Sequence, residues 1–308
     1  MPCSNPMYAV RMGDKFKFIG AVQSDPTMSK AKYMFSSEEK FIILPCGQCV
    51  GCRLERSRSW AIRCSLEKQL HKDSCFLTLT YDDEHLPRDY SLHKEHLTNF
   101  FKRLRKNESI QFRYFACGEY GDLYSRPHYH VILFGYRPDD LVPVGQTMGN
   151  TLYTSPKILK AWQNQGYVSL GEVTFESCAY VARYIMKKIT GDRAEEHYHG
   201  REPEYVVMSR RPGIAHDWLL KYDGDVYPND YVVVRGDIKT KPPRYFDNIY
   251  AQLYGDGALE EIKSERFAEQ VKSFNRNLDE FTLDRMVTKG RIKEIKNRLL
   301  KRSLDERL

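Results

Sequence analysis

Short β-rich runs alternate with amphipathic stretches between residues 75 and 191, and this order constrains the fold more than any other feature of the chain. Glycine, proline and polar turn residues bound the runs, as they bound β-strands. The predicted strands are 75–81, 111–121, 128–135 and 167–175, and the predicted helices are 94–107, 155–166 and 176–191. Such a mixed order predicts an α+β fold, in which helices flank a central antiparallel β-sheet.

The segments on either side of this core differ from it in composition. Residues 1–70 are rich in cysteine, with one predicted strand in "KFIILP" and one predicted helix at 53–71. We expect this segment to pack on a core at 71–240. Residues 241–308 are charged and mostly helical in period, and predict a helical C-terminal extension. The extension can be an arm that contacts DNA or assembles copies, or simply a solvated helix.

The charge balance favours a polyanionic partner. The 308 residues carry 48 Lys+Arg against 41 Asp+Glu, a net charge of +7, although a solvated surface would explain the same excess. No apolar run approaches the ~20 residues of a membrane-spanning helix, and no secretory signal is visible at the N-terminus. We therefore expect a soluble protein with no membrane partner.

Two histidines and a glutamate form the first candidate site. Strand side chains alternate between faces, so His128 and His130 point to one face while Tyr129 and Val131 point to the other. Glu119 lies on the preceding strand, and a hairpin can place it beside both imidazoles. Two imidazoles and a carboxylate can bind a divalent metal and leave positions open for a phosphate oxygen. Histidines that only hydrogen-bond within the sheet are the structural alternative.

Two tyrosines form the second candidate site. Tyr180 and Tyr184 are four residues apart in a predicted helix and therefore share a face. A tyrosine hydroxyl can attack a phosphodiester and form a covalent intermediate. Arg183 and Lys187 lie on a neighbouring stripe and Lys188 continues the tyrosine stripe, so all three can supply positive charge to the transition state or hold DNA. Aromatic packing of the helix onto the sheet is the alternative.

The cysteines form a third candidate site. Cys46, Cys49 and Cys52 have C-x-x-C-x-x-C spacing, which allows three thiolates to bind one soft metal. We expect structural zinc with Cys3 as the fourth ligand, and Cys64 is the second choice. An iron–sulfur cluster is the rival, but the next cysteine of the ferredoxin pattern is missing. Reduced thiols without metal are the third interpretation, because the absence of a signal peptide favours a reducing compartment.

These motifs together resemble the HUH endonucleases, whose signature is His-bulky-His followed by a helix with one or two tyrosines. Here the histidine motif is "HYH", the tyrosine motif is "YVARYIMK", and "FLTLTY" is similar to an upstream strand motif of the superfamily. The cysteine block and "SRRPGIAHDW" narrow the resemblance to the replication initiators of gokushovirus-type microviruses. The resemblance implies an HUH fold and a two-tyrosine, rolling-circle type of activity.

The resemblance also implies a mechanism. His128, His130 and Glu119 would bind Mg²⁺ or Mn²⁺, and one tyrosine would nick a single-stranded DNA origin, leaving a 5′-phosphotyrosine and a free 3′-OH. The partners would be the host DNA polymerase and helicase, in the cytoplasm of a bacterial host. No G-x-x-x-x-G-K-[ST] loop is present, so no helicase is expected in the chain itself.

Several alternatives stay open at this point. Within the HUH class, a transposase or relaxase would also fit, and relaxases commonly use three histidines, so His85 can replace Glu119 as third ligand. Outside it, the chain can be a non-catalytic, zinc-containing DNA-binding protein or a redox iron–sulfur protein. The helix 94–107 and the segment "MSRRPG" are candidate contacts to the DNA backbone, because Arg and Lys reach phosphates whatever the base sequence.

Overall fold

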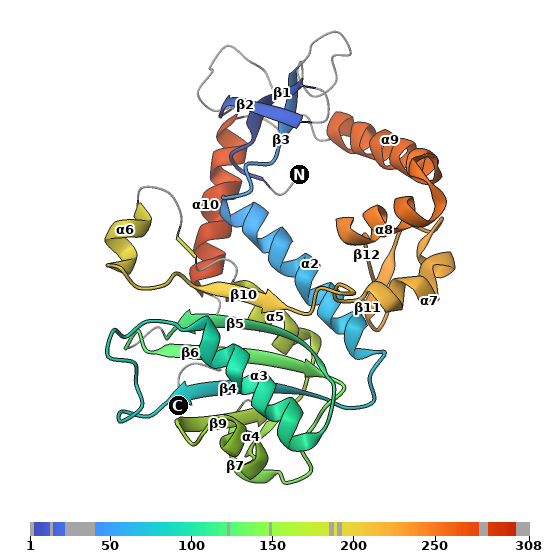
Figure 1. The fold of residues 1–308 in the computed structure, drawn as a ribbon. Helices are drawn as coiled ribbons and strands as arrows, with labels where there is room; N and C mark the ends of the chain where they lie inside the picture. The colour runs from blue at the N-terminus through green and yellow to red at the C-terminus, as the bar shows by residue number, and fades with distance from the viewer. Residues whose placement is uncertain are drawn as a thin grey trace. The chain divides into compact units, whose positions relative to one another are not determined.

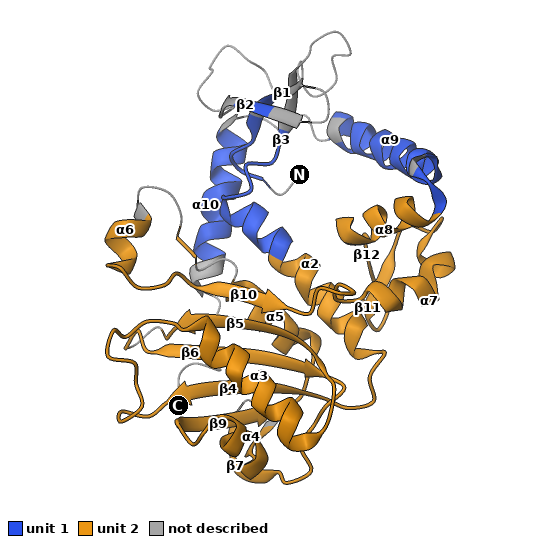
Figure 2. Ribbon diagram, in the orientation of Figure 1, with its two compact units in different colours: residues 1–56, 254–301 blue, residues 57–253, 302–308 orange. Residues whose placement is uncertain are grey.

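The chain folds into two compact units (Figures 1 and 2). The structure is a computed structural model, and it describes residues 3–12, 15–21, 41–121, 124–147, 150–184, 188–189, 193–276 and 283–299. Unit 1 comprises residues 1–56 and 254–301, and unit 2 comprises residues 57–253 and 302–308. The N-terminal segment therefore belongs with the C-terminal helices, a long-range association that no local sequence pattern indicates. The three-part division expected from the sequence stays a prediction.

Unit 1 contains a small antiparallel sheet and helices. The sheet has the strand order β2-β1-β3, and its third strand confirms the strand predicted in "KFIILP". The elements of unit 1 are β1 (Met7–Met12), β2 (Lys15–Ala21), β3 (Phe41–Leu44), a short 3-10 helix (Asp256–Leu259), α9 (Glu260–Arg276) and α10 (Leu283–Leu299). Helix α2 (Val50–Lys68) begins in this unit and continues into the other.

Unit 2 is built on a seven-stranded antiparallel sheet with the order β10-β5-β6-β4-β9-β8-β7. Its strands are β4 (Ser74–Tyr81), β5 (Arg113–Tyr120), β6 (Pro127–Phe134), β7 (Val142–Thr147), β8 (Asn150–Thr154), β9 (Gly166–Gly171) and β10 (Tyr205–Met208). The four strands predicted in the core are all present, which confirms the α+β class with a central antiparallel sheet. Strands β7, β8 and β10 were not predicted; β7 and β10 lie at the edges of the sheet, and β7 contains Pro143 and Gly145, which weaken a strand pattern.

Helices flank this sheet and extend beyond it. They are α3 (Lys94–Glu108), α4 (Pro156–Ala161), α5 (Phe175–Arg183), α6 (Arg193–Tyr198), α7 (His216–Val226) and α8 (Arg244–Tyr254). A separate hairpin pairs β11 (Val232–Arg235) with β12 (Ile238–Thr240).

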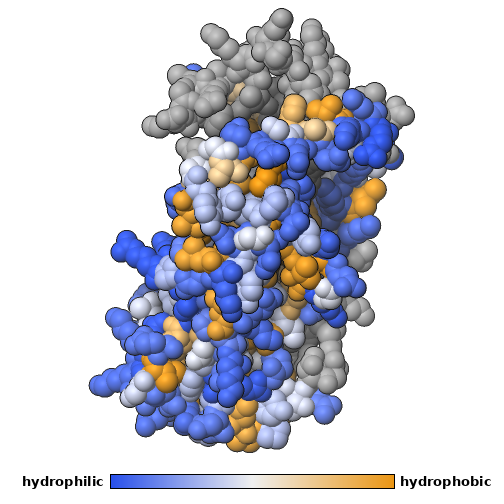
Figure 3. All heavy atoms as spheres, turned by 90° about the vertical axis from the view of Figure 1, so that its right-hand side faces the viewer, coloured by the Kyte–Doolittle hydropathy of each residue, from blue (hydrophilic) through white to orange (hydrophobic). Residues whose placement is uncertain are grey.

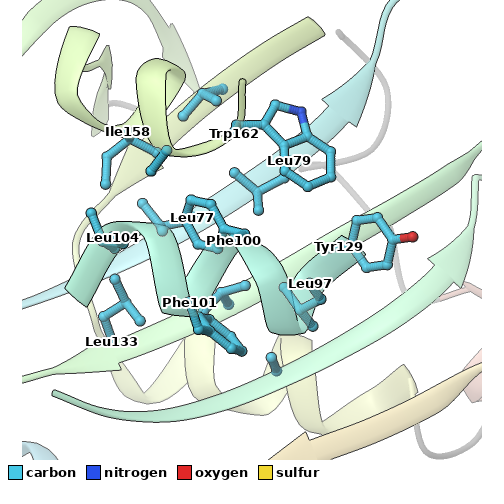
Figure 4. Packing of buried hydrophobic residues seen from close by; sticks show 14 of the residues in the cluster. Leu77, Leu79, Leu97, Phe100, Phe101, Leu104, Tyr129, Leu133, Ile158 and Trp162 are labelled. Atoms are coloured by element: carbon cyan, nitrogen blue, oxygen red, sulfur yellow. The ribbon is translucent and has the colours of Figure 1, made fainter. Parts of the chain in front are cut away.

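Helices α3 and α4 cover one face of the sheet. The buried side of α3 consists of Leu97, Phe100, Phe101 and Leu104, a spacing that aligns them on one helical stripe. They pack with Leu77, Leu79, Tyr129, Leu133, Ile158 and Trp162 in the larger of two cores (Figure 4). This core makes one face of the sheet mostly apolar, and the strands' charged and imidazole groups Glu119, His128 and His130 lie on the other face.

Helix α5 covers that other face, and it is shorter than predicted. The helix begins at a capping box, in which the hydroxyl of Thr174 accepts from the Ser177 amide and the Ser177 hydroxyl accepts from the Thr174 amide. It ends at Arg183, with Tyr184 as its C-cap, although the sequence predicts a helix to residue 191. The Ile189 amide donates instead to the hydroxyl of Tyr198 at 2.9 Å, so a tertiary partner replaces the helical carbonyl.

Glu67, near the end of α2, forms an ion pair with Arg113 of β5 and so connects this helix to the sheet. Its carboxylate is 2% exposed and accepts from Arg113 Nε at 2.5 Å, from the Ala215 amide at 2.6 Å and from His71 Nε2 at 3.0 Å. Burial alone would raise the pKa of Glu67, but the hydrogen bonds from His71, the Ala215 amide and Arg113 outweigh it. The pKa of Glu67 therefore lies below its usual value.

One face of the molecule is mostly polar. In the face drawn in Figure 3, hydrophilic residues predominate and hydrophobic residues form small scattered groups. Among the helices that the structure describes, none is both long and apolar enough to cross a membrane.

Candidate active site and cysteine cluster

The histidine motif lies on β6, between β5 and β4. In the antiparallel register, His128 is opposite Glu119 of β5, and His130 is opposite Thr78 of β4. Tyr129 and Val131 are fully buried in the apolar core under α3. The strand alternation predicted from the sequence is thus confirmed, and the hairpin brings Glu119 to the same face as both histidines.

His130 and Glu119 are in direct contact. Their atoms Nε2 and Oε1 are 3.2 Å apart, and the side chains are 3% and 1% exposed. The other ring nitrogen, Nδ1, lies 3.0 Å from the hydroxyl of Thr78. A second hydrogen bond of this kind fixes the orientation of the ring and the nitrogen that faces the carboxylate. Thr78 therefore orients His130 toward Glu119.

His128 is oriented by a different group. Its Nδ1 donates to the main-chain carbonyl of Arg126 at 2.7 Å, which leaves the lone pair on Nε2. The Arg126 side chain in turn donates to Asp83 at 2.5 Å and to the carbonyl of Tyr81 at 2.9 Å. A Cβ on Gly121 would lie 3.0 Å from the His128 ring, so the close approach requires a small residue there. These contacts leave Nε2 of His128 as the ring nitrogen that could bind a metal.

Thr80 gives a further sign that this face can take a ligand. It lies opposite His128 in the register, two residues from Thr78 on the same strand. Its hydroxyl oxygen is buried and has no hydrogen-bond partner among the described residues. Such an orphaned group costs free energy unless water or a ligand satisfies it. A hydrated cation held by the neighbouring carboxylate and imidazoles would do so.

His85, the alternative third ligand, is placed elsewhere. It lies in the loop after β4, where its Nδ1 contacts Asp82 Oδ1 at 2.7 Å, and its side chain is 46% exposed. Glu119 is the carboxylate that contacts His130. The donor atoms of Glu119, His128 and His130 do not converge as closely as those of the cysteine cluster described below.

Both tyrosines pack directly on His130. The Tyr180 ring meets the imidazole edge-on with centroids 5.2 Å apart, and the Tyr184 ring stacks on it at 5.0 Å. The Tyr184 hydroxyl donates to the Tyr180 hydroxyl. The two residues are 5% and 4% exposed. Two potential nucleophiles and the imidazole–carboxylate pair therefore form one buried cluster, drawn from α5, its C-cap residue, β5 and β6.

Of the three basic residues predicted beside the tyrosines, one contacts a tyrosine ring in the structure. The guanidinium of Arg183 lies 6.0 Å from the centroid of the Tyr180 ring, close enough for a cation–π contact. Lys188 is exposed, whereas Lys187 lies outside the described residues.

The candidate DNA-backbone contacts also differ from one another. Helix α3 covers the sheet face opposite the histidines, and its Arg103 and Arg105 donate to the carbonyls of Ala161 and Phe112. Only part of its positive charge is thus available to a ligand. In the segment "MSRRPG", Arg210 and Arg211 are exposed.

Four cysteines of unit 1 converge on one point. Cys3, Cys46, Cys49 and Cys52 place their sulfur atoms within 4.8 Å of one another, and within the described ranges this is the group of potential metal ligands that converges in this way. Cys64 lies apart, buried in the core of unit 2. The cluster can therefore hold a metal ion, with Cys3 rather than Cys64 as the fourth ligand.

The thiols of the cluster differ in pKa. The hydrogen bond from Cys3 lowers the pKa of Cys49 to about 3, and the same contact raises the pKa of Cys3. Burial raises the pKa of Cys52 to about 11. One thiolate is thus stabilised by the remaining thiols when no cation is present.

Sequence reasoning missed the residues that support the site. Thr78, Thr80 and Arg126 were not predicted, although the alternation in "FLTLTY" places both threonines on one face. Their partners could not be predicted, because the contacts depend on the register of neighbouring strands.

Comparisons with known proteins place the chain among phage proteins. The family model "Replication-associated protein ORF2/G2P" matches residues 74–190, a range that includes both tyrosines, both histidines and Glu119. Replication-associated protein VP4 of Bdellovibrio phage phiMH2K is 35% identical over 260 residues, which is 80% of this chain and 81% of that protein. Replication-associated protein ORF2 of Spiroplasma virus 4 is 33% identical over 287 residues, 86% of each chain. Replication-associated protein ORF4 of Chlamydia phage 1 is 31% identical over 223 residues, 69% of this chain and 55% of that protein. No solved structure matches the chain.

Proposed function

The chain belongs to the family of microvirus replication-associated proteins, and from this premise we propose that it initiates rolling-circle replication by nicking single-stranded origin DNA. The proposed reaction is a metal-dependent transesterification by a tyrosine of an HUH-type nuclease. A role in phage replication follows from the family, and the chemistry is our proposal.

One observation carries this proposal most strongly. Two tyrosine hydroxyls and a buried carboxylate–imidazole pair meet in one cluster, with Tyr180 and Tyr184 both in ring contact with His130. A protein that only binds DNA has no need for two phenol hydroxyls placed beside a carboxylate–imidazole pair.

Each residue has a separate task in this mechanism. Glu119, His128 and His130 would hold Mg²⁺ or Mn²⁺, which when bound would polarise the scissile phosphate. The phenol oxygen of one tyrosine forms a bond to phosphorus as the bond to the 3′ oxygen breaks. The phenol proton passes through solvent to the leaving oxygen, giving a 5′-phosphotyrosine and a free 3′-OH. Arg183 and Lys188 stabilise the charge on the transferred phosphoryl group.

The second tyrosine allows a second transfer without release of the product. The free 3′-OH primes synthesis by the host polymerase, with the host helicase separating the strands. After one round the other tyrosine cleaves the regenerated origin, and the new 3′-OH attacks the old phosphotyrosine to close a circle. We expect these steps in the cytoplasm of the bacterial host. Because both rings are almost fully buried, the DNA strand must displace the side chains that cover them.

A cleavage assay with Mn²⁺ and single-stranded origin DNA tests the proposal. The variants are Tyr180→Phe, Tyr184→Phe, the double variant and His128→Ala, with the exposed Tyr90→Phe as matched control. We expect a covalent protein–DNA adduct in the wild type and the control, and none in the double variant or in His128→Ala.

The alternatives predict other results. A non-catalytic, zinc-containing DNA-binding protein would bind the strand and form no adduct with any variant. An HUH transposase or relaxase would form an adduct but would join the cut end to a different strand instead of closing a circle.

A further inference from the structure

The cysteine cluster of unit 1 draws on two separate pieces of chain, residue 3 and residues 46–52. Cys3 precedes β1, Cys46 follows β3, and Cys49 and Cys52 lie at the start of α2. The cluster lies outside residues 74–190, the range of the family model, and none of its members takes part in the proposed nicking reaction.

The sulfur–sulfur distances fit a single bound ion. Cys3 Sγ lies 3.6 Å from Cys46 Sγ and 3.8 Å from Cys49 Sγ. A disulfide would bring two sulfurs to ~2.05 Å. Four thiolates around Zn²⁺ at ~2.3 Å in a tetrahedron have edges of ~3.8 Å. A multi-iron cluster would hold the cysteine sulfurs further apart, because inorganic sulfides lie between its iron atoms.

Backbone amides point at the sulfur atoms. The amide of Cys46 donates to Cys3 Sγ at 3.4 Å, the amide of Cys49 to Cys46 Sγ at 3.2 Å, and the amide of Ser4 to Cys49 Sγ at 3.4 Å. Amide donors of this kind neutralise part of the charge of a metal-bound thiolate and orient it. The turn between Cys46 and Cys49 contains Gly47 at φ +74°, a conformation that glycine adopts without strain.

We propose that Cys3, Cys46, Cys49 and Cys52 bind one structural Zn²⁺ ion. Four protein ligands leave no position for water or substrate, so the ion acts on folding rather than on chemistry. It fixes the N-terminal segment to the start of α2. This proposal does not depend on the proposed nuclease activity.

The ion also supports a helix from the far end of the chain. A Cβ on Gly290 of α10 would lie 2.9 Å from the Cβ of Ser4, so α10 packs closely against the residue next to Cys3. Loss of the metal should therefore loosen both the N-terminal segment and α10 within unit 1.

Metal analysis of the full-length chain tests this inference. We expect about one zinc per purified chain, and visible absorption bands of tetrahedral thiolate-bound cobalt after Co²⁺ exchange. Cys49→Ala should lose the zinc, whereas the matched control Cys75→Ala, at a buried cysteine of unit 2, should keep it. Limited proteolysis of Cys49→Ala should cut the N-terminal segment and α10 faster than in the control.

If Cys49→Ala does not fold, titration of the wild type with an organomercurial reagent replaces it, and zinc should be released as the cluster thiols react. Zinc-free wild-type protein purified in the presence of zinc would overturn the proposal, as would unchanged zinc in folded Cys49→Ala. Brown protein containing iron and sulfide would overturn it in favour of a cluster. Because the readouts are metal content and proteolysis, a failed nicking assay leaves this test unaffected.

Discussion

Replacement of Thr78 by valine isolates one hydrogen bond of the proposed metal site. Valine has nearly the same shape as threonine and suits a strand, so β4 should keep its pairing. The change removes the hydroxyl that lies 3.0 Å from His130 Nδ1. Thr78 is 5% exposed and His130 is 2% exposed, so water cannot readily replace the lost partner.

The expected size follows from the role of such supporting bonds. Loss of a group that orients a metal-binding histidine typically weakens metal affinity by about 10- to 100-fold, or about 1.4 to 2.8 kcal/mol. An unpaired ring nitrogen in the core costs about 1 to 3 kcal/mol of folding stability. Thr78→Val should therefore raise the Mn²⁺ concentration for half-maximal nicking at least about tenfold.

The assay is the rate of adduct formation on single-stranded origin DNA as a function of Mn²⁺ concentration, together with thermal unfolding. Thr78→Ser is the matched control, because it keeps the hydroxyl, and its Mn²⁺ dependence should stay near that of the wild type. Wild-type Mn²⁺ dependence in a fully folded Thr78→Val would refute the reasoning. An equal shift in Thr78→Ser would do so too, because the lost methyl group rather than the hydrogen bond would then be the cause.

Three further variants test other parts of unit 2. Glu67→Gln should destabilise the fold by about 3 kcal/mol near neutral pH. Because the folded pKa of Glu67 is lowered, ionised Glu67 stabilises above its unfolded pKa of about 4.3. The difference in Tm from the wild type should therefore be largest above that pH and shrink as the pH falls through the folded pKa; a constant difference would contradict this account. Gly166→Ala should cost more than about 4 kcal/mol by denaturant unfolding, since Gly166 has φ +146° and its Cβ would lie 2.3 Å from backbone atoms, whereas Gly145→Ala has open space and should be neutral. Arg126→Met removes the side-chain contacts that hold the main-chain carbonyl of residue 126 against His128. The Mn²⁺ concentration for half-maximal nicking should therefore rise by up to about tenfold. An unchanged Mn²⁺ titration would show that this carbonyl is held in place without the side chain.

Local periodicity determined much of the site from the sequence alone. A period of two placed His128 and His130 on one face, and a period near four placed Tyr180 and Tyr184 together. Both patterns are properties of a single strand or helix, so they hold whatever the rest of the chain does. The same reasoning predicted the core strands and the α+β class.

Long-range pairing decided what surrounds these residues. The register of three strands brings Thr78 and Glu119 to His130. Helix α5 ends at Arg183 because of tertiary contacts, which the helix propensities of its own residues do not predict. Strand β7 forms because β8 offers it hydrogen bonds, although its own Pro143 and Gly145 are weak strand formers.

For the cysteine cluster too, the sequence predicts part of the ligand set and the tertiary structure supplies the rest. The spacing of Cys46, Cys49 and Cys52 lies within one short segment and was readable directly. Their fourth partner, Cys3, lies 43 residues before Cys46 in the chain. It joins them only when the chain folds back. Sequence determined the chemistry that each element can present, because side-chain direction is local. Tertiary structure alone decided which elements meet, because contacts between distant residues depend on how the whole chain packs.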